Sequence, residues 1–141
     1  MQTVDSAQAG NGRIVALASG DVVALLVFAA IGRSSHGEPI GPAAFGEVLY
    51  TATPFLVAWL ISAPLLGGFS LQTTNTPLKM LRATAVSWCA ALVLGAVVRA
   101  IMIGRFSHYT FYVMTFLVAM LILCVWRGTF ALWEQRGDRV A

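Results

Sequence analysis

The sequence predicts an all-α membrane protein: a four-helix antiparallel transmembrane bundle followed by a short C-terminal interfacial helix. Three observations predict this fold. Of the 141 residues, 58% are hydrophobic and only 11% are charged, whereas a soluble domain carries about 25% charged residues. The mean hydropathy is +0.79, and the apolar residues form four long runs. A water-soluble fold is therefore excluded, and residues 1–141 fit one integral membrane domain.

Four apolar runs are long enough to cross a bilayer. A spanning helix needs roughly 20 residues, because the hydrocarbon core is about 30 Å thick and a helix rises about 1.5 Å per residue. The polar stretch 67–77 is predicted to be a loop. Residues 129–136 are too short to span and are amphipathic, so we expect them to lie at the headgroup level. The predicted spans are 14–31, 48–66, 83–103 and 109–126.

Lysines and arginines near the span ends predict the orientation. Basic residues are enriched in cytoplasmic segments, and an inward N-terminus puts six of them inside and three outside. The six are Arg13, Lys79, Arg82, Arg127, Arg136 and Arg139, and the three are Arg33, Arg99 and Arg105. We therefore expect a multi-pass protein of a bacterial inner (cytoplasmic) membrane with both termini cytoplasmic.

Composition and motifs exclude several function classes. The basic residues are scattered, so no surface for nucleic acid is predicted. Cys89 and Cys124 lie inside apolar runs and are interpreted as small core residues. The sequence contains no HExxH, GxSxG or P-loop motif, so we predict no catalytic residue and no metal site, and the cofactor stays unidentified. The expected partners are the lipid bilayer and either a second copy of the chain or a larger membrane complex.

Two ionisable residues lie within the predicted spans and are the first functional candidates. A charge at the centre of a spanning helix costs about 2.5 to 3.5 kcal/mol and requires compensation. Asp21 lies near the middle of the first span, and Arg99 lies near the outer end of the third, on a stripe of small residues. We predict that Asp21 and Arg99 form a charge pair, directly or through water. Alternatively, Arg99 reaches the headgroups while Asp21 is protonated or bonds to Ser19 or the backbone.

A second polar group is predicted at the outer face, at the mouth of a pocket between the first three spans. Two of its members are histidines, which can ligate a haem, a chlorophyll-type magnesium or a transition metal, or sense pH. The alternative is that the histidines are hydrated or bonded to a carboxylate. The candidate pocket residues are Arg33, His36, Glu38, Arg105 and His108.

Three further residues are candidates for lining a cavity. Pro54 and Trp59 lie in the second span and Trp88 lies in the third. Such a cavity would take a hydrophobic ligand. The alternative is that the two tryptophans pack in the core or anchor the helices at a given depth.

Several short motifs in the first 70 residues resemble an uncharacterised family of small prokaryotic membrane proteins, catalogued as a domain of unknown function. The resemblance implies a four-helix integral membrane domain and no established activity, substrate or cofactor. It places Asp21, Arg33 and His36 within the recognisable pattern. The residues that carry it are Gly20-Asp21, Phe28, Ile31-Gly32-Arg33, Ser35-His36-Gly37, Thr53-Pro54-Phe55 and Trp59.

Three functions of different classes fit these observations. The first is a non-enzymatic accessory or scaffolding subunit of a membrane complex, because interior charges can set helix register and partner choice. The second is a small dimeric proton-coupled transporter that uses Asp21. The third is a haem-, pigment- or metal-binding membrane protein that uses His36, His108 or both.

Overall fold

The computed structural model describes residues 2–39 and 41–140, which are mostly helical and include no strand. Four helices are long and apolar enough to cross a membrane, which confirms the predicted all-α fold. The elements in chain order are α1 (Gln2–Ser35), the 3₁₀ helix η1 (Pro42–Ala44), α2 (Phe45–Leu65), α3 (Leu71–Thr74), α4 (Pro77–Ile103) and α5 (Tyr109–Val140).

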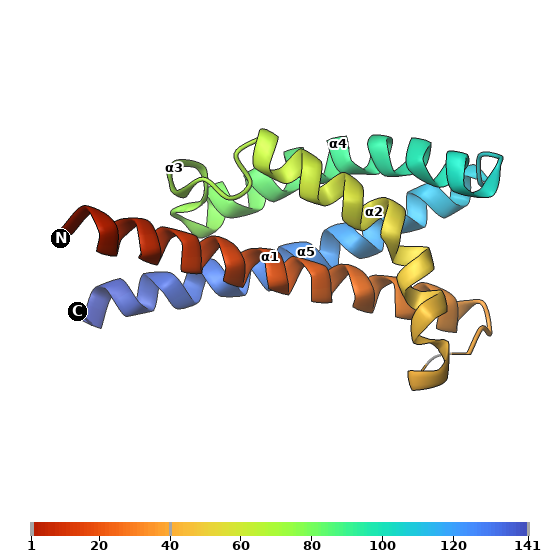
Figure 1. The fold of residues 1–141 in the computed structure, drawn as a ribbon, viewed down its shortest axis with the longest axis horizontal. Helices are drawn as coiled ribbons and strands as arrows, with labels where there is room; N and C mark the ends of the chain where they lie inside the picture. The colour runs from red at the N-terminus through yellow and green to blue at the C-terminus, as the bar shows by residue number, and fades with distance from the viewer. Residues whose placement is uncertain (1, 40, 141) are drawn as a thin grey trace.

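The four long helices form an elongated bundle in which α1 and α5 run antiparallel (Figure 1). Both ends of the chain lie at one end of the bundle, together with α3. Helix α1 packs on α2 and α5, and α4 packs on the same two helices. The contacts therefore close a ring in the order α1, α2, α4, α5, which leaves one shared interior between the four spans.

The helices extend beyond the predicted spans at one end or at both. The short helix α3 lies inside the segment predicted to be a loop. Residues 129–136 do not form a separate helix, because they continue α5 without a break. The physical reason is burial: Phe130 and Ala131 pack with Leu17 and Met80 in a small apolar cluster. This segment is therefore an extension of the core at that end of the bundle.

Local signals explain where α4 begins and ends. Thr76 has an extended backbone, and its hydroxyl accepts a hydrogen bond from the backbone N–H of Lys79, as an N-cap residue does. Pro77 occupies the first turn, where its missing N–H has no cost. At the other end Gly104 has a φ of 74°, a left-handed conformation that favours glycine and stops the helix.

The core contains two places where glycine allows another helix to approach closely. A Cβ atom at Gly20 would overlap the indole of Trp126. The backbone of α1 at Gly20 therefore packs directly against a side-chain ring of α5. A Cβ atom at Gly95 would lie 2.7 Å from a ring carbon of Phe55, so α4 and α2 meet in the same way. Small residues at such contacts are typical of packed membrane helices.

The Gly20 contact leads to a stability prediction. We expect Gly20→Ala to lower the free energy of unfolding by about 1 to 3 kcal/mol, because the added methyl group forces the Trp126 ring to move in a packed interior. Gly32→Ala is the matched control on α1, since a Cβ atom there meets nothing within 4 Å. Unfolding of both variants in mixed detergent, followed by circular dichroism, measures the effect. Equal stabilities would contradict the packing of Trp126 on Gly20.

Candidate functional site

An ion pair between Asp21 of α1 and Arg127 of α5 lies in the interior of the bundle. The Nε–H of Arg127 donates to Oδ1 of Asp21 at 2.8 Å. Nη2 donates to Oδ2 at 2.6 Å. Both side chains are 0% exposed. This two-point contact is the geometry in which a guanidinium binds a carboxylate most strongly.

The polar atoms of the pair that face away from each other are also bonded. Nε1 of Trp59, on α2, donates to Oδ2 of Asp21 at 3.0 Å. Nη1 of Arg127 donates to the carbonyl oxygen of Gly68 at 2.6 Å and lies 3.9 Å from Sδ of Met80. The site therefore joins α1, α2, α4 and α5 through directional contacts.

Aromatic rings surround the guanidinium of Arg127. Its central carbon lies 4.9 Å from the ring centroid of Trp59 and 4.9 Å from that of Phe69. Contacts of this kind attract a cation through the negative face of the ring. Trp88 packs against Trp59, with 6.1 Å between the ring centroids. The charge of Arg127 is therefore stabilised by a carboxylate and two rings in a site without exposed surface.

Helical spacing explains why Asp21 and Arg127 point inward. On α5, every fourth residue from Thr115 is buried, and Arg127 belongs to that stripe. Its members are Thr115, Ala119, Leu123, Arg127 and Ala131. On α1, Asp21 lies between the buried Leu17 and Leu25, also at intervals of four. Residues at this spacing share one helix face.

The turn after α2 supplies the carbonyl that Arg127 uses. Gly67 has a φ of 76°, which favours glycine. The chain then turns back so that the N–H of Gly68 donates to the carbonyl of Ala63 at 2.6 Å. A Cβ atom at Gly68 would lie 2.9 Å from that same oxygen. Glycine at position 68 therefore allows the tight turn that aims its own carbonyl at Arg127.

Asp21 and Arg127 lie at matching depth. The candidate spans are Gly10–Ser35 and Tyr109–Gly137. Asp21 is eleven residues from the first end and Arg127 is ten residues from the last, or about 16 Å and 15 Å along the helices. Because α1 and α5 are antiparallel, these two ends lie at the same side of the bundle. Opposite charges so far from the headgroups compensate each other.

The structure corrects the predicted pairing of Asp21 with Arg99. Arg99 lies near the opposite end of the bundle, where its Nε–H donates to Oγ of Ser107 at 3.2 Å. Its guanidinium carbon lies 4.4 Å from the ring centroid of Phe111. The physical reason is which parts of the helices are neighbours. Asp21 faces α2 and the C-terminal half of α5, whereas Arg99 faces the first turn of α5.

Arg127 is absent from the predicted site because the fourth predicted span ends at residue 126. That boundary made Arg127 a flanking residue at the headgroups. Two signals favoured an interior position. The segment after it, from Thr129 to Trp133, is again apolar, and no proline interrupts the helix. Arg127 also continues the four-residue stripe of small and apolar residues described above.

The predicted outer-face group is only partly brought together. Arg33 lies 3.5 Å from Glu38 and 3.9 Å from Glu47 in two ion pairs. These three residues, with Pro39, Ala43 and Ala44, line a hollow of about 590 Å³. His36, Arg105 and His108 do not line it. His36 and Arg105 are exposed, and Arg105 belongs to the connection between α4 and α5.

The structure places the two histidines on different connections. His36 follows α1, and His108 precedes α5, where its Nδ1 lies 3.0 Å from Oγ1 of Thr110 and its ring centroid lies 4.4 Å from that of Tyr109, with the two rings tilted by 39°. Among the described residues, no group of three or more histidine, cysteine or acidic side chains could hold a metal ion. Binding of a haem or metal by His36 or His108 stays a prediction.

The three candidate cavity residues lie in the packed interior. Pro54, Trp59 and Trp88 are all buried. Nε1 of Trp88 donates to the carbonyl oxygen of Phe116 at 3.3 Å, so each tryptophan ring is tied to another helix by its N–H. None of the three lines the hollow at Arg33 or a second surface groove, between α2, α3 and α4, that Leu66, Lys79 and Arg82 help to line. Trp59 therefore enters the site as the hydrogen-bond donor to Asp21.

A second, partly buried link lies nearer the chain termini. Nε of Arg13 donates to Oε1 of Glu134 at 2.6 Å, and Nη2 donates to Oε2 at 3.0 Å. Nη2 also lies 3.1 Å from Oγ1 of Thr74. This link joins α1, α3 and α5 on the same side of the bundle as the Asp21–Arg127 pair. Two charged contacts therefore hold α1 against α5 along their shared length.

Comparison with known proteins adds one match. A family model described as a protein of unknown function (DUF3054) matches residues 18–130, which include Asp21, Trp59 and Arg127. No curated protein and no solved structure matches the chain. The matched segment covers most of the sequence and confirms the resemblance seen in the first 70 residues. The chain belongs to the DUF3054 family, whose function is unknown.

Proposed function

We propose that the protein is a non-enzymatic accessory or scaffolding subunit of a complex in a bacterial inner membrane, with both termini cytoplasmic. The observation that carries this proposal is the complete hydrogen bonding of the buried Asp21–Arg127 pair. Both oxygens of Asp21 and all three guanidinium nitrogens of Arg127 have partners. Such a pair fixes the register of helices and leaves the outer surface of the bundle to contact other components.

The enclosure of Asp21 supports a structural role over transport. A carboxylate that carries protons must exchange them with water, yet Asp21 is 0% exposed and accepts a hydrogen bond from Nε1 of Trp59. Neither the hollow at Arg33 nor the groove at Lys79 includes Asp21. The proton-coupled transporter would require the pair with Arg127 to open in each cycle.

Extraction from native membranes tests the proposal. The chain, tagged at its C-terminus and solubilised in a mild detergent, is expected to co-purify with another membrane protein in a fixed ratio, measured by quantitative mass spectrometry. An unrelated four-span protein with the same tag is the control. Recovery of the chain alone, under conditions that keep other membrane complexes whole, would contradict the proposal.

Proteoliposomes separate the transporter from the subunit. If the protein is a proton-coupled transporter, wild-type vesicles accumulate a substrate when a pH gradient is applied, and Asp21→Asn abolishes that accumulation. We expect no gradient-driven uptake with either protein. The same preparation tests cofactor binding, because a bound haem or pigment gives a visible absorption band that His36→Ala or His108→Ala removes.

A further inference from the structure

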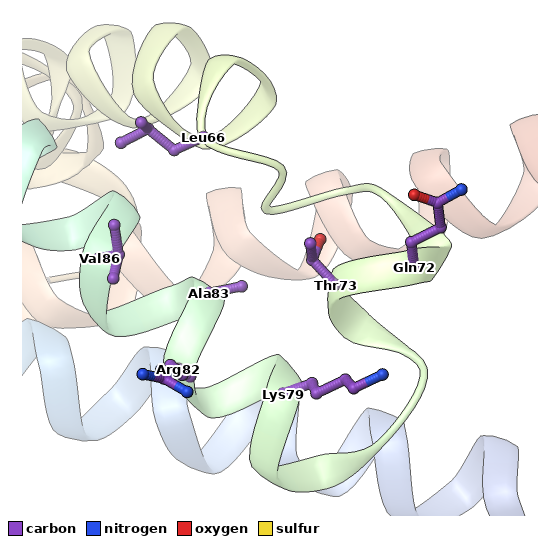
Figure 2. A pocket seen from close by; sticks show the side chains of 7 residues that line it. All are labelled: Leu66, Gln72, Thr73, Lys79, Arg82, Ala83 and Val86. Carbon is purple, nitrogen blue, oxygen red and sulfur yellow. The ribbon is translucent and has the colours of Figure 1, made fainter.

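We propose that a groove between α2, α3 and α4 binds the headgroup of an anionic phospholipid. The groove holds about 310 Å³, which is within the range of pockets that take small ligands. Lys79 and Arg82 of α4 lie along one side of it, and Leu66 lies across from them at the end of α2 (Figure 2). The site is independent of the Asp21–Arg127 pair.

The charge of the groove favours an anion. Two of its lining side chains are cationic and none is acidic. Lys79 and Arg82 are both exposed, and neither takes part in any of the ion pairs found among the described side chains. Gln72 of α3 adds an amide group at the same rim, whereas the Thr73 hydroxyl already donates to the carbonyl oxygen of Gly67. These groups together can donate hydrogen bonds to phosphate oxygens.

The apolar part of the groove favours a lipid over a free phosphate ion. Val86 and Leu66 are 52% and 43% exposed, although they line the same groove as the two cations. Val86 lies seven residues beyond Lys79 on α4, or about 10 Å deeper into the span. The groove is therefore basic at the end of the bundle and apolar toward the hydrocarbon core, which is the polarity of a lipid.

The position of the groove agrees with the predicted orientation. It lies at the end of the bundle that carries both chain termini, and the positive-inside pattern makes that end cytoplasmic. Basic pockets between spanning helices on that side bind anionic headgroups, and juxtamembrane basic residues are attracted to anionic lipids. A phosphatidylglycerol-type headgroup is therefore the occupant that we infer.

Native mass spectrometry of the full-length protein tests this inference. The protein in detergent is titrated with phosphatidylglycerol, with phosphatidylcholine, or with inorganic phosphate. We expect saturable binding of one phosphatidylglycerol per chain, weaker binding of phosphatidylcholine and no competition by phosphate. We expect the double substitution Lys79→Gln and Arg82→Gln to weaken phosphatidylglycerol binding by about thirtyfold, because two surface cations are lost.

Two control variants and one further variant make the result specific. Arg136→Gln removes an exposed cation at the same end of the bundle but outside the groove, and Arg105→Gln removes one at the opposite end; both should bind phosphatidylglycerol as the wild type does. Gln72→Glu adds a negative charge at the rim and should weaken binding without removing a cation. The Gln72→Glu variant still tests phosphatidylglycerol binding in the groove if the Lys79→Gln and Arg82→Gln double variant folds poorly.

Three outcomes would overturn the inference. The first is equal affinity for phosphatidylglycerol and phosphatidylcholine, which would show binding without headgroup recognition. The second is unchanged phosphatidylglycerol binding in both the double variant and Gln72→Glu. The third is displacement of the lipid by inorganic phosphate at comparable concentration, which would make the groove a site for a soluble phosphate compound.

Discussion

Asp21→Leu is expected to lower the free energy of unfolding by about 3 to 5 kcal/mol, because it leaves Arg127 charged and unpaired in a fully buried site. The guanidinium would lose two of its hydrogen bonds and keep the one to the carbonyl of Gly68. Unfolding in mixed detergent micelles, followed by circular dichroism, measures the loss. Arg99→Leu is the control, since Arg99 is a partly exposed arginine in a span that does not contact Asp21.

The double variant Asp21→Leu with Arg127→Leu separates pairing from simple destabilisation. Removing both charges avoids the unpaired ion, and replacing a buried ion pair by apolar residues is often neutral or stabilising. We expect the double variant to recover more than half of the loss, with the remainder due to the freed Nε1–H of Trp59 and carbonyl of Gly68. Additive losses in the double variant would reject a direct interaction of Asp21 with Arg127.

Trp59→Ala is expected to cost about 3 to 5 kcal/mol, because it opens a cavity beneath the ion pair in a closely packed core. The ring is 0% exposed and contacts both Trp88 and the guanidinium of Arg127. Trp133→Ala is the matched control, since Trp133 is 70% exposed on α5 and should change stability little. The same unfolding measurement applies, and similar losses in both variants would contradict the buried position of Trp59.

Trp59→Phe isolates the hydrogen bond from the volume of the ring. Phenylalanine fills much of the same space but cannot donate to Oδ2 of Asp21. A hydrogen bond to a charged group contributes about 1.5 to 3 kcal/mol, so we expect a loss of that size. Trp88→Phe should cost less, because Nε1 of Trp88 donates to a neutral backbone carbonyl at 3.3 Å.

The four spans could be predicted from hydropathy because lipid imposes a minimum apolar length that few other folds require. Span ends were less predictable, because a helix does not stop where its hydropathy falls. Residues 129–136 show this: Arg127 and Gly128 lower the local hydropathy, yet the buried Phe130 and Ala131 carry α5 onward. Because the fourth predicted span ended too early, Arg127 was not recognised as the partner of Asp21.

Asp21 could be identified as anomalous from its sequence position alone, because a short acidic side chain at that depth cannot reach the headgroups. Its partner depended on which helices are neighbours, and hydropathy does not give that information. The ring of contacts places α1 beside α5 and α2. The donor role of Trp59 likewise required the relative rotation of α1 and α2, which no pattern within one helix specifies.

Solid-state NMR in lipid bilayers tests the Asp21–Arg127 contact itself, by measuring the dipolar coupling between the guanidinium nitrogens of Arg127 and the carboxyl carbon of Asp21. Signals that disappear in Asp21→Asn and in Arg127→Lys identify the pair. We expect a strong coupling that corresponds to direct contact, as in the 2.6 and 2.8 Å hydrogen bonds. The absence of that coupling, or a coupling of the Asp21 carboxyl carbon to Arg99 in its place, would contradict it.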